Sequence, residues 1–183
     1  MVYEDITVLD SGSKEEKIRA LESLSNTNDP KIINKIILRL DDSDIEVRGE
    51  AFSSLVLNEN NISNQLINNL KSENKNIRGF SALVLANRRN SDAILEIKNL
   101  TKDQNDMVKA CALGALGYLN AKQSSKEIHD CFFDSNIEVR KSALMAAIKI
   151  GDKISNEEFS ELSMDKDPEI EKLLIQAKKI LNN

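Results

Sequence analysis

Apolar residues recur along the chain at nearly constant intervals, each in a similar polar context. The similarity is clearest between the strings DIEVR at residues 44–48 and NIEVR at residues 136–140. The apolar residue before the basic position, with its counterparts further along, gives the anchor residues Val47, Ile77, Val108, Val139 and Ile170. These anchors lie 30, 31, 31 and 31 residues apart, and one further step back from Val47 reaches Glu16. The pattern predicts six copies of one repeat.

Each anchor lies near the start of a predicted helix. Three residues before it stands a residue with a short polar side chain that can cap a helix N-terminus: Ser13, Asp44, Asn74, Asn105, Asn136 and Asp167. Four residues after it stands Ala20, Ala51, Ser81, Ala112, Ala143 or Leu174, and eight after it Leu24, Leu55, Leu85, Leu116, Ala147 or Lys178. A small residue followed one turn later by a large one favours close helix packing.

A second amphipathic run precedes each of these helices, so every repeat is predicted to be a helix pair. The preceding runs are 29–40, 62–70, 91–100, 124–133 and 155–164, and Val2, Ile6 and Leu9 fit a shortened first helix for the opening repeat. The repeats then span about 1–26, 27–58, 59–88, 89–120, 121–151 and 152–183. We interpret residues 1–183 as a single domain.

A second apolar column lies five residues after the anchors, at Leu21, Phe52, Ala82, Leu113, Leu144 and Ile175. A helix with apolar stripes on two sides packs between two neighbours, which is typical of stacked repeats. Glycine (6), proline (2) and tryptophan (0) are too scarce for a β-sandwich or barrel. The predicted fold is therefore all-α, an α-solenoid (superhelix). Lys178 and Lys179 replace apolar residues in the last helix and predict a polar end to the stack.

The same residues resemble the HEAT repeat family, specifically the short HEAT-like repeats of the phycobilisome-lyase type. The shared signature is a turn Asp, then Val-Arg, then Ala-Leu, as in Asp134, Val139-Arg140 and Ala143-Leu144. The resemblance implies that turn aspartates bind basic residues in a ladder along one edge, formed by Asp42, Asp103, Asp134, Asp165, Arg48, Arg78, Lys109 and Arg140. Ser72 replaces the turn Asp in the third repeat. The family mixes scaffolds, lyase subunits and DNA-repair enzymes, so the resemblance concerns the fold.

The net charge, the cysteines and the absence of targeting segments limit the kinds of function that the sequence is compatible with. The net charge of −5 argues against a protein that mainly grips nucleic-acid phosphates, and Arg88-Arg89 is the only adjacent arginine pair. Cys111 and Cys131 have no metal-ligand spacing and are compatible with a reducing cytosol. We find neither a signal peptide nor an apolar stretch near the roughly 20 residues of a membrane span. The sequence predicts a cytoplasmic protein without membrane contact.

Candidate catalytic and metal-binding residues are few. His129 is the only histidine, and Cys131 lies two positions from it on a predicted helix, where the two side chains diverge. The two cysteines lie on different repeats, so together with one histidine they do not make a zinc site without carboxylates, and no spacing suggests one. We therefore predict no enzyme activity, no catalytic residue, no metal and no cofactor.

Wheel geometry places several large side chains on the outward side of the second helices, which usually line the concave face of such a solenoid. The predicted partner-binding residues there are Leu57, Phe80, Leu83, Cys111, Tyr118 and Met145. An exposed apolar patch of this kind indicates a protein or peptide site. Alternatively, these side chains pack on one another or against a second copy of the chain.

The sequence therefore favours a non-enzymatic scaffold or adaptor that binds another protein or peptide through this face. It specifies neither that partner nor an oligomeric state. One alternative is a subunit similar to a phycobilin lyase, which holds a bilin and its acceptor protein. A less favoured alternative is a HEAT-like nucleic-acid-binding protein.

Overall fold

The computed structural model describes residues 2–181, and the side chains of residues 6–179. Its regular secondary structure consists of helices only, with no strand among the described residues. It divides into two compact units, residues 1–90 and 91–183. Met1, Asn182, Asn183 and the side chain of Val2, all assigned to the predicted end repeats, lie outside the described part. The predicted all-α class is confirmed.

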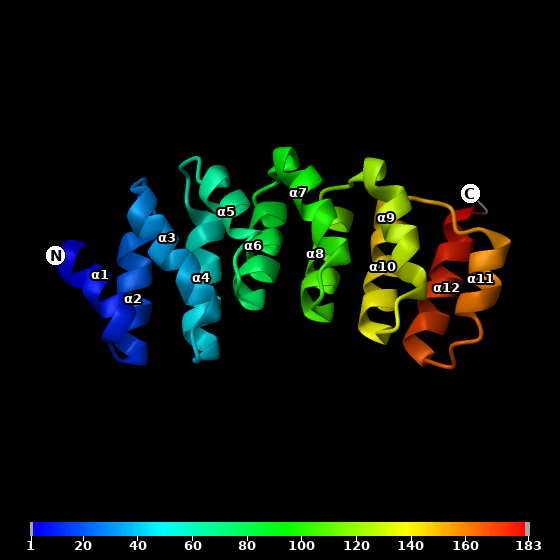
Figure 1. Cartoon of the computed structure of the whole chain (residues 1–183), viewed down its shortest axis with the longest axis horizontal. Helices are drawn as coiled ribbons and strands as arrows, with labels where there is room; N and C mark the ends of the chain where they lie inside the picture. Colours follow the sequence, from blue (N-terminus) through cyan, green and yellow to red (C-terminus); the bar gives the residue numbers. More distant parts are fainter. Residues whose placement is uncertain (1, 182–183) are drawn as a thin grey trace. The chain divides into compact units, whose positions relative to one another are not determined.

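The first unit contains three helix pairs (Figure 1). Its helices are α1 (Val2–Ser11), α2 (Lys14–Leu24), α3 (Pro30–Leu38), α4 (Ile45–Leu57), α5 (Ser63–Asn69) and α6 (Lys75–Asn87). The second helices pack in a row, α2 on α4 and α4 on α6, while α1, α3 and α5 form a second row beside them. The result is a two-layered stack of helix pairs.

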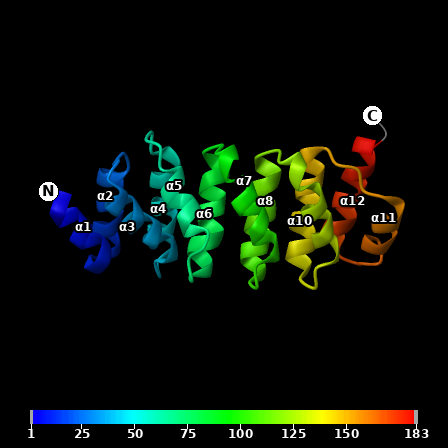
Figure 2. The ribbon, with the colours of Figure 1, turned by 45° about the horizontal axis from the view of Figure 1, so that its top comes forward.

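The second unit repeats this arrangement with shorter first helices (Figure 2). Its α-helices are α7 (Ile94–Asn99), α8 (Asp106–Tyr118), α9 (Ser125–Asp130), α10 (Ile137–Ile150), α11 (Asn156–Leu162) and α12 (Pro168–Leu181). Helix α10 packs between α8 and α12. Short 3-10 turns extend the first helices of both units: η1 (Arg39–Asp41), η2 (Ser91–Ala93), η3 (Leu100–Lys102), η4 (Lys122–Ser124) and η5 (Cys131–Phe133).

The predicted helix starts are confirmed. A side-chain oxygen accepts a hydrogen bond from a backbone N–H of the first turn at all six predicted caps, Ser13, Asp44, Asn74, Asn105, Asn136 and Asp167. Ser13 and Ser155 each form a complete capping box, with Glu16 and Glu158. The caps satisfy N–H groups that have no partner within the helix, so the start of each second helix is fixed by local chemistry.

The predicted core columns are buried with two exceptions. Every anchor from Val47 to Ile170 is buried, as are all six residues four positions after the anchors. In the column five positions after the anchors, Phe52 is only half-buried and Ile175 is 59% exposed. The prediction of a buried side chain was wrong for Ile175, whereas Phe52 does face the next helix, α6, but is only partly covered by it. Ile175 lies on the last described helix, and Phe52 borders a hollow described below.

An arginine closes the end of the second helix pair. The guanidinium of Arg88 donates hydrogen bonds to the backbone carbonyls of Leu55, Val56, Asn58 and Asn60. The last carbonyls of a helix have no partner within it, so Arg88 satisfies the end of α4 from the end of α6. Arg88 is therefore a structural residue, whereas Arg89 beside it is exposed.

No helix among residues 2–181 combines the length and the apolar character that a membrane crossing requires.

Candidate protein-binding surface

The second helices of both units carry exposed apolar side chains. Leu57, the last residue of α4, is 74% exposed, and Tyr118 on α8 and Met145 on α10 are also exposed. Phe80 and Leu83 on α6 and Cys111 on α8 are half-buried. Isolated exposed apolar residues are ordinary, but several within one unit can contribute to a surface that binds a protein.

In the first unit, two of the predicted residues border a hollow between α4 and α6. Phe80 and Leu83 line it with Ile45, Arg48, Gly49 and Phe52, and its volume is about 350 Å³. Leu57 does not line this hollow. Ile45, Arg48 and Phe52 were not predicted as site residues, because their repeat positions assigned them to a helix start, the charge ladder and the core.

Gly49 is one of the residues that line this hollow. It lies inside α4, where glycine costs about 1 kcal/mol of helix stability relative to alanine. Packing does not require glycine there, since a Cβ atom at this position would have no neighbour within 4 Å. Gly49 thus keeps open a depression that a larger side chain would fill, and it was the one signal in the sequence that could have indicated the hollow.

Cys111 differs from the other predicted residues. Burial raises the pKa of its thiol to about 11, and its Sγ lies 3.5 Å from the Sδ of Met107 on the same helix. Only a small thiolate fraction exists at neutral pH, so Cys111 behaves as a packing residue with little nucleophilic reactivity.

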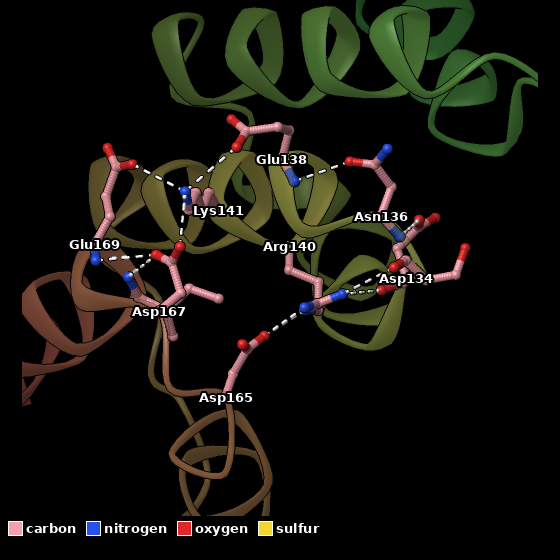
Figure 3. A network of polar contacts seen from close by, with 10 residues as sticks. Asp134, Asn136, Glu138, Arg140, Lys141, Asp165, Asp167 and Glu169 are labelled. Atoms are coloured by element: carbon pink, nitrogen blue, oxygen red, sulfur yellow. Dashed lines mark hydrogen bonds and ion pairs between the residues drawn. The ribbon is translucent and has the colours of Figure 1, made fainter.

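The predicted charge ladder is present between several neighbouring pairs. Lys109 contacts Asp134, and Arg140 contacts Asp165 through Nε and Nη2 (Figure 3). Lys17, which the sequence interpretation left out, binds Asp42 at 2.8 Å. In each case the basic residue of one pair binds the turn Asp of the next pair, so the contact connects successive repeats.

Arg48 departs from this arrangement, and its predicted place in the carboxylate ladder was wrong. Its Nη1 donates to the backbone carbonyls of Asp42 (2.7 Å) and Ser43 (3.1 Å) in its own turn. Among the described residues, no carboxylate pairs with it. The reason is the substitution in the next turn, where Ser72 offers no negative charge and uses its hydroxyl to accept the N–H of Asn74.

Acid should weaken the contact between Lys17 and Asp42. Burial alone would raise the pKa of Asp42, but hydrogen bonds from Lys17 and from the Asp44 backbone outweigh it and hold the pKa below its ordinary value. A carboxyl with a lowered pKa stabilises the folded state above its unfolded pKa, and this contribution is lost as the pH falls through the folded value. We expect Asp42→Asn to cost about 1 kcal/mol at pH 7.

Denaturant titration of wild type and Asp42→Asn at several pH values checks this expectation. The difference in unfolding free energy should be constant near neutrality and shrink below about pH 4. A difference that stays the same down to pH 2 would contradict the assignment of the charge on Asp42 to this contact.

His129 connects the last two repeats of the second unit. Its Nδ1 lies 2.7 Å from Oε1 of Glu158, its Nε2 lies 3.3 Å from Oδ2 of Asp152, and its ring packs on Phe132. The Ser125 hydroxyl donates to Asp152 and not to the imidazole, so this group lacks the serine-to-histidine contact that activates a nucleophile. Within the described residues, no three His, Cys, Asp or Glu side chains are grouped to hold a metal ion.

Charged side chains border the apolar surface on α10. Lys141, one helical turn before Met145, forms ion pairs with Glu138, Asp167 and Glu169 (Figure 3). The hydrogen bond to Glu169 is the main contact that raises the pKa of Lys141. A polar rim around apolar residues is the usual composition of a protein-binding surface.

Comparison with known proteins assigns the fold. No protein-family model matches the sequence, and no curated protein matches it either. Among solved structures, the complex of CpcE and CpcF of phycocyanin lyase from Nostoc sp. PCC7120 is similar, with a TM-score of 0.68, 18% identity, and coverage of 82% of this chain and 99% of that one.

Two further structures are similar over nearly the whole chain. A designed armadillo repeat protein in complex with peptide (KR)4 has a TM-score of 0.58 and 16% identity, with 98% of each chain covered. Kap121p bound to Nup53p has a TM-score of 0.57 and 17% identity, covering 98% of this chain and 23% of Kap121p. At these identities the likeness is one of fold. Together with the repeated caps and buried columns, it shows that this chain has a HEAT-like repeat fold of the α-solenoid class.

Proposed function

We propose that this protein is a non-enzymatic scaffold that binds another protein or peptide through the exposed side of its second helices. The observation that carries the proposal is the set of exposed or half-buried apolar residues on those helices, namely Leu57, Phe80 and Leu83 in the first unit and Cys111, Tyr118 and Met145 in the second. Cys111 contributes packing area only. In this proposal, residues 1–183 act as one repeat domain, and the binding face is its concave face.

The similar structures support a protein partner. One contains a bound peptide, one joins CpcE to CpcF, and one joins Kap121p to Nup53p. The free thiols of Cys111 and Cys131 are compatible with the cytoplasmic location expected from the sequence. The negative net charge, −5, makes a protein partner the better proposal than nucleic acid.

Affinity purification from the native host tests the proposal. The bait variant Leu57→Asp/Tyr118→Asp/Met145→Asp changes only exposed residues, and the matched control Leu38→Asp/Leu95→Asp changes exposed residues of first helices α3 and α7. We expect the same partner with wild type and the control, and loss of it with the triple variant. Capture that survives the triple variant, with all three proteins equally folded by circular dichroism, would refute the proposed face.

The similarity to the CpcE–CpcF complex supports one other function, that of a lyase-like subunit which holds a bilin and its acceptor protein. Coexpression with a bilin and candidate acceptor proteins separates the two functions. Covalent transfer of colour to an acceptor favours the lyase-like subunit, and its absence together with capture of a stable partner favours the scaffold.

A further inference from the structure

We propose that the hollow between α4 and α6 binds a segment of a partner protein in which a bulky apolar side chain lies beside an acidic one. The apolar side chain enters the hollow over Gly49, and the carboxylate pairs with Arg48. This inference rests on the proposed scaffold function and specifies the partner chemistry at one part of its surface.

The charge of the segment follows from a comparison of Arg48 with Arg140. Both arginines donate from Nη1 to the two carbonyls of their own turn, at 2.7 and 3.1 Å for Arg48 and at 2.8 and 3.1 Å for Arg140. Arg140 also donates from Nε and Nη2 to the carboxylate of Asp165. The same two donors of Arg48 have no acceptor among the residues that the structure describes, because Ser72 stands where the carboxylate belongs.

A guanidinium edge with two parallel donors matches the geometry of a carboxylate. Arg48 is half-buried and is one of the residues that line the hollow, so a carboxylate next to a side chain seated there lies close to this arginine. No acidic residue is among those lining the hollow, and Arg48 is the only charged one. Charge complementarity therefore favours an acidic segment. The designed armadillo protein was solved with a peptide of the opposite charge, (KR)4.

The apolar side chain of the proposed segment is inferred from the residues that line the hollow. Apart from Arg48, every lining residue is apolar or glycine: Ile45, Gly49, Phe52, Phe80 and Leu83. A volume of about 350 Å³ lies near the lower limit of ligand sites, about 300 Å³, which suits an anchoring side chain of a peptide. Aromatic walls around such an anchor are typical of the residues that contribute most to protein binding.

Selection from a random peptide library displayed on phage, with the full chain immobilised, tests the inference. We expect the enriched peptides to share Leu, Ile, Phe or Met next to Asp or Glu. A fluorescent copy of the most enriched peptide should then bind Arg48→Ala at least about tenfold more weakly than wild type, since a hydrogen-bonded charge pair is lost. The matched control Arg89→Ala, an exposed arginine of the same unit, should bind as wild type does.

Gly49→Leu provides a second variant that is independent of the arginine. Its side chain fills the hollow without meeting protein atoms near the Cβ, so the fold is kept while the anchor is excluded. We expect loss of peptide binding with unchanged or higher thermal stability. Arg48 also donates hydrogen bonds to the carbonyls of its own turn, so Arg48→Ala can unfold the protein. In that case Gly49→Leu alone tests whether the peptide binds in the hollow.

Several results would overturn the inference. They are enrichment of basic or uncharged peptides, peptide binding that Gly49→Leu leaves unchanged, and sedimentation showing a dimer of the wild type that Gly49→Leu dissociates, since a second copy then occupies the hollow. Absence of any enriched peptide overturns it as well. None of these results alters partner capture by the wild type and its loss in Leu57→Asp/Tyr118→Asp/Met145→Asp, so failure here is distinct from failure of the scaffold function.

Discussion

Replacing Arg88 with alanine is expected to lower the free energy of unfolding by about 2–4 kcal/mol, because four backbone carbonyls lose a charged donor. Two of these carbonyls, of Leu55 and Val56, belong to the end of α4, and the other two belong to the loop that follows it. The substitution therefore releases the helix end and the loop together. Chemical denaturation followed by circular dichroism measures the change.

Arg89→Ala is the matched control. Arg89 is the adjacent residue, carries the same charge and is exposed, so we expect a change within about 0.5 kcal/mol. Both arginine and alanine carry a Cβ, so the positive φ of 58° at this position affects wild type and variant alike. Equal effects of the two substitutions would show that Arg88 acts through its charge alone and does not hold the loop.

Leu55→Ala is expected to destabilise the protein by about 2–5 kcal/mol, and Leu57→Ala by less than about 0.5 kcal/mol. The two leucines lie two positions apart on α4, with exposures of 1% and 74%. Leu55 occupies the buried column eight positions after an anchor, so its truncation leaves a cavity in the core. Leu57 projects from the opposite side, where alanine removes only exposed surface.

Thermal and denaturant unfolding of the two variants gives the comparison directly, since the chemical change is the same. A loss at Leu57 as large as at Leu55 would mean that Leu57 is covered in the folded protein. The proposed binding surface would then lose its most exposed member.

The sequence determined the repeat because each of its features acts locally. A polar cap three residues before an anchor and a small residue four after it specify a helix start and a close contact, whatever lies elsewhere. The caps at Asp44 and Asn136 and the buried Ala51 and Ala143 were predictable for this reason.

The hollow could not be predicted in the same way, because it depends on how one repeat differs from the others. Phe52 occupies a core column but turns toward the space left open by Gly49, and Arg48 loses its carboxylate only because Ser72 belongs to the next repeat. Arg88 contacts a loop about 30 positions earlier in the chain, and no recurring sequence pattern indicates this contact. A residue that differs from its counterparts in the other repeats therefore indicates a site only when the structure shows which side chains surround it.

Exposure of individual side chains in the presence of the partner is the most direct test of the scaffold function. Hydroxyl-radical footprinting with mass spectrometry compares the free protein with the protein bound to its purified partner. We predict that Leu57, Tyr118 and Met145 on the second helices become protected, while Leu38, Leu95 and Met164, which are equally open in the free protein, remain reactive. Protection of Leu38, Leu95 and Met164 with unchanged labelling of Leu57, Tyr118 and Met145 would contradict binding through the second helices.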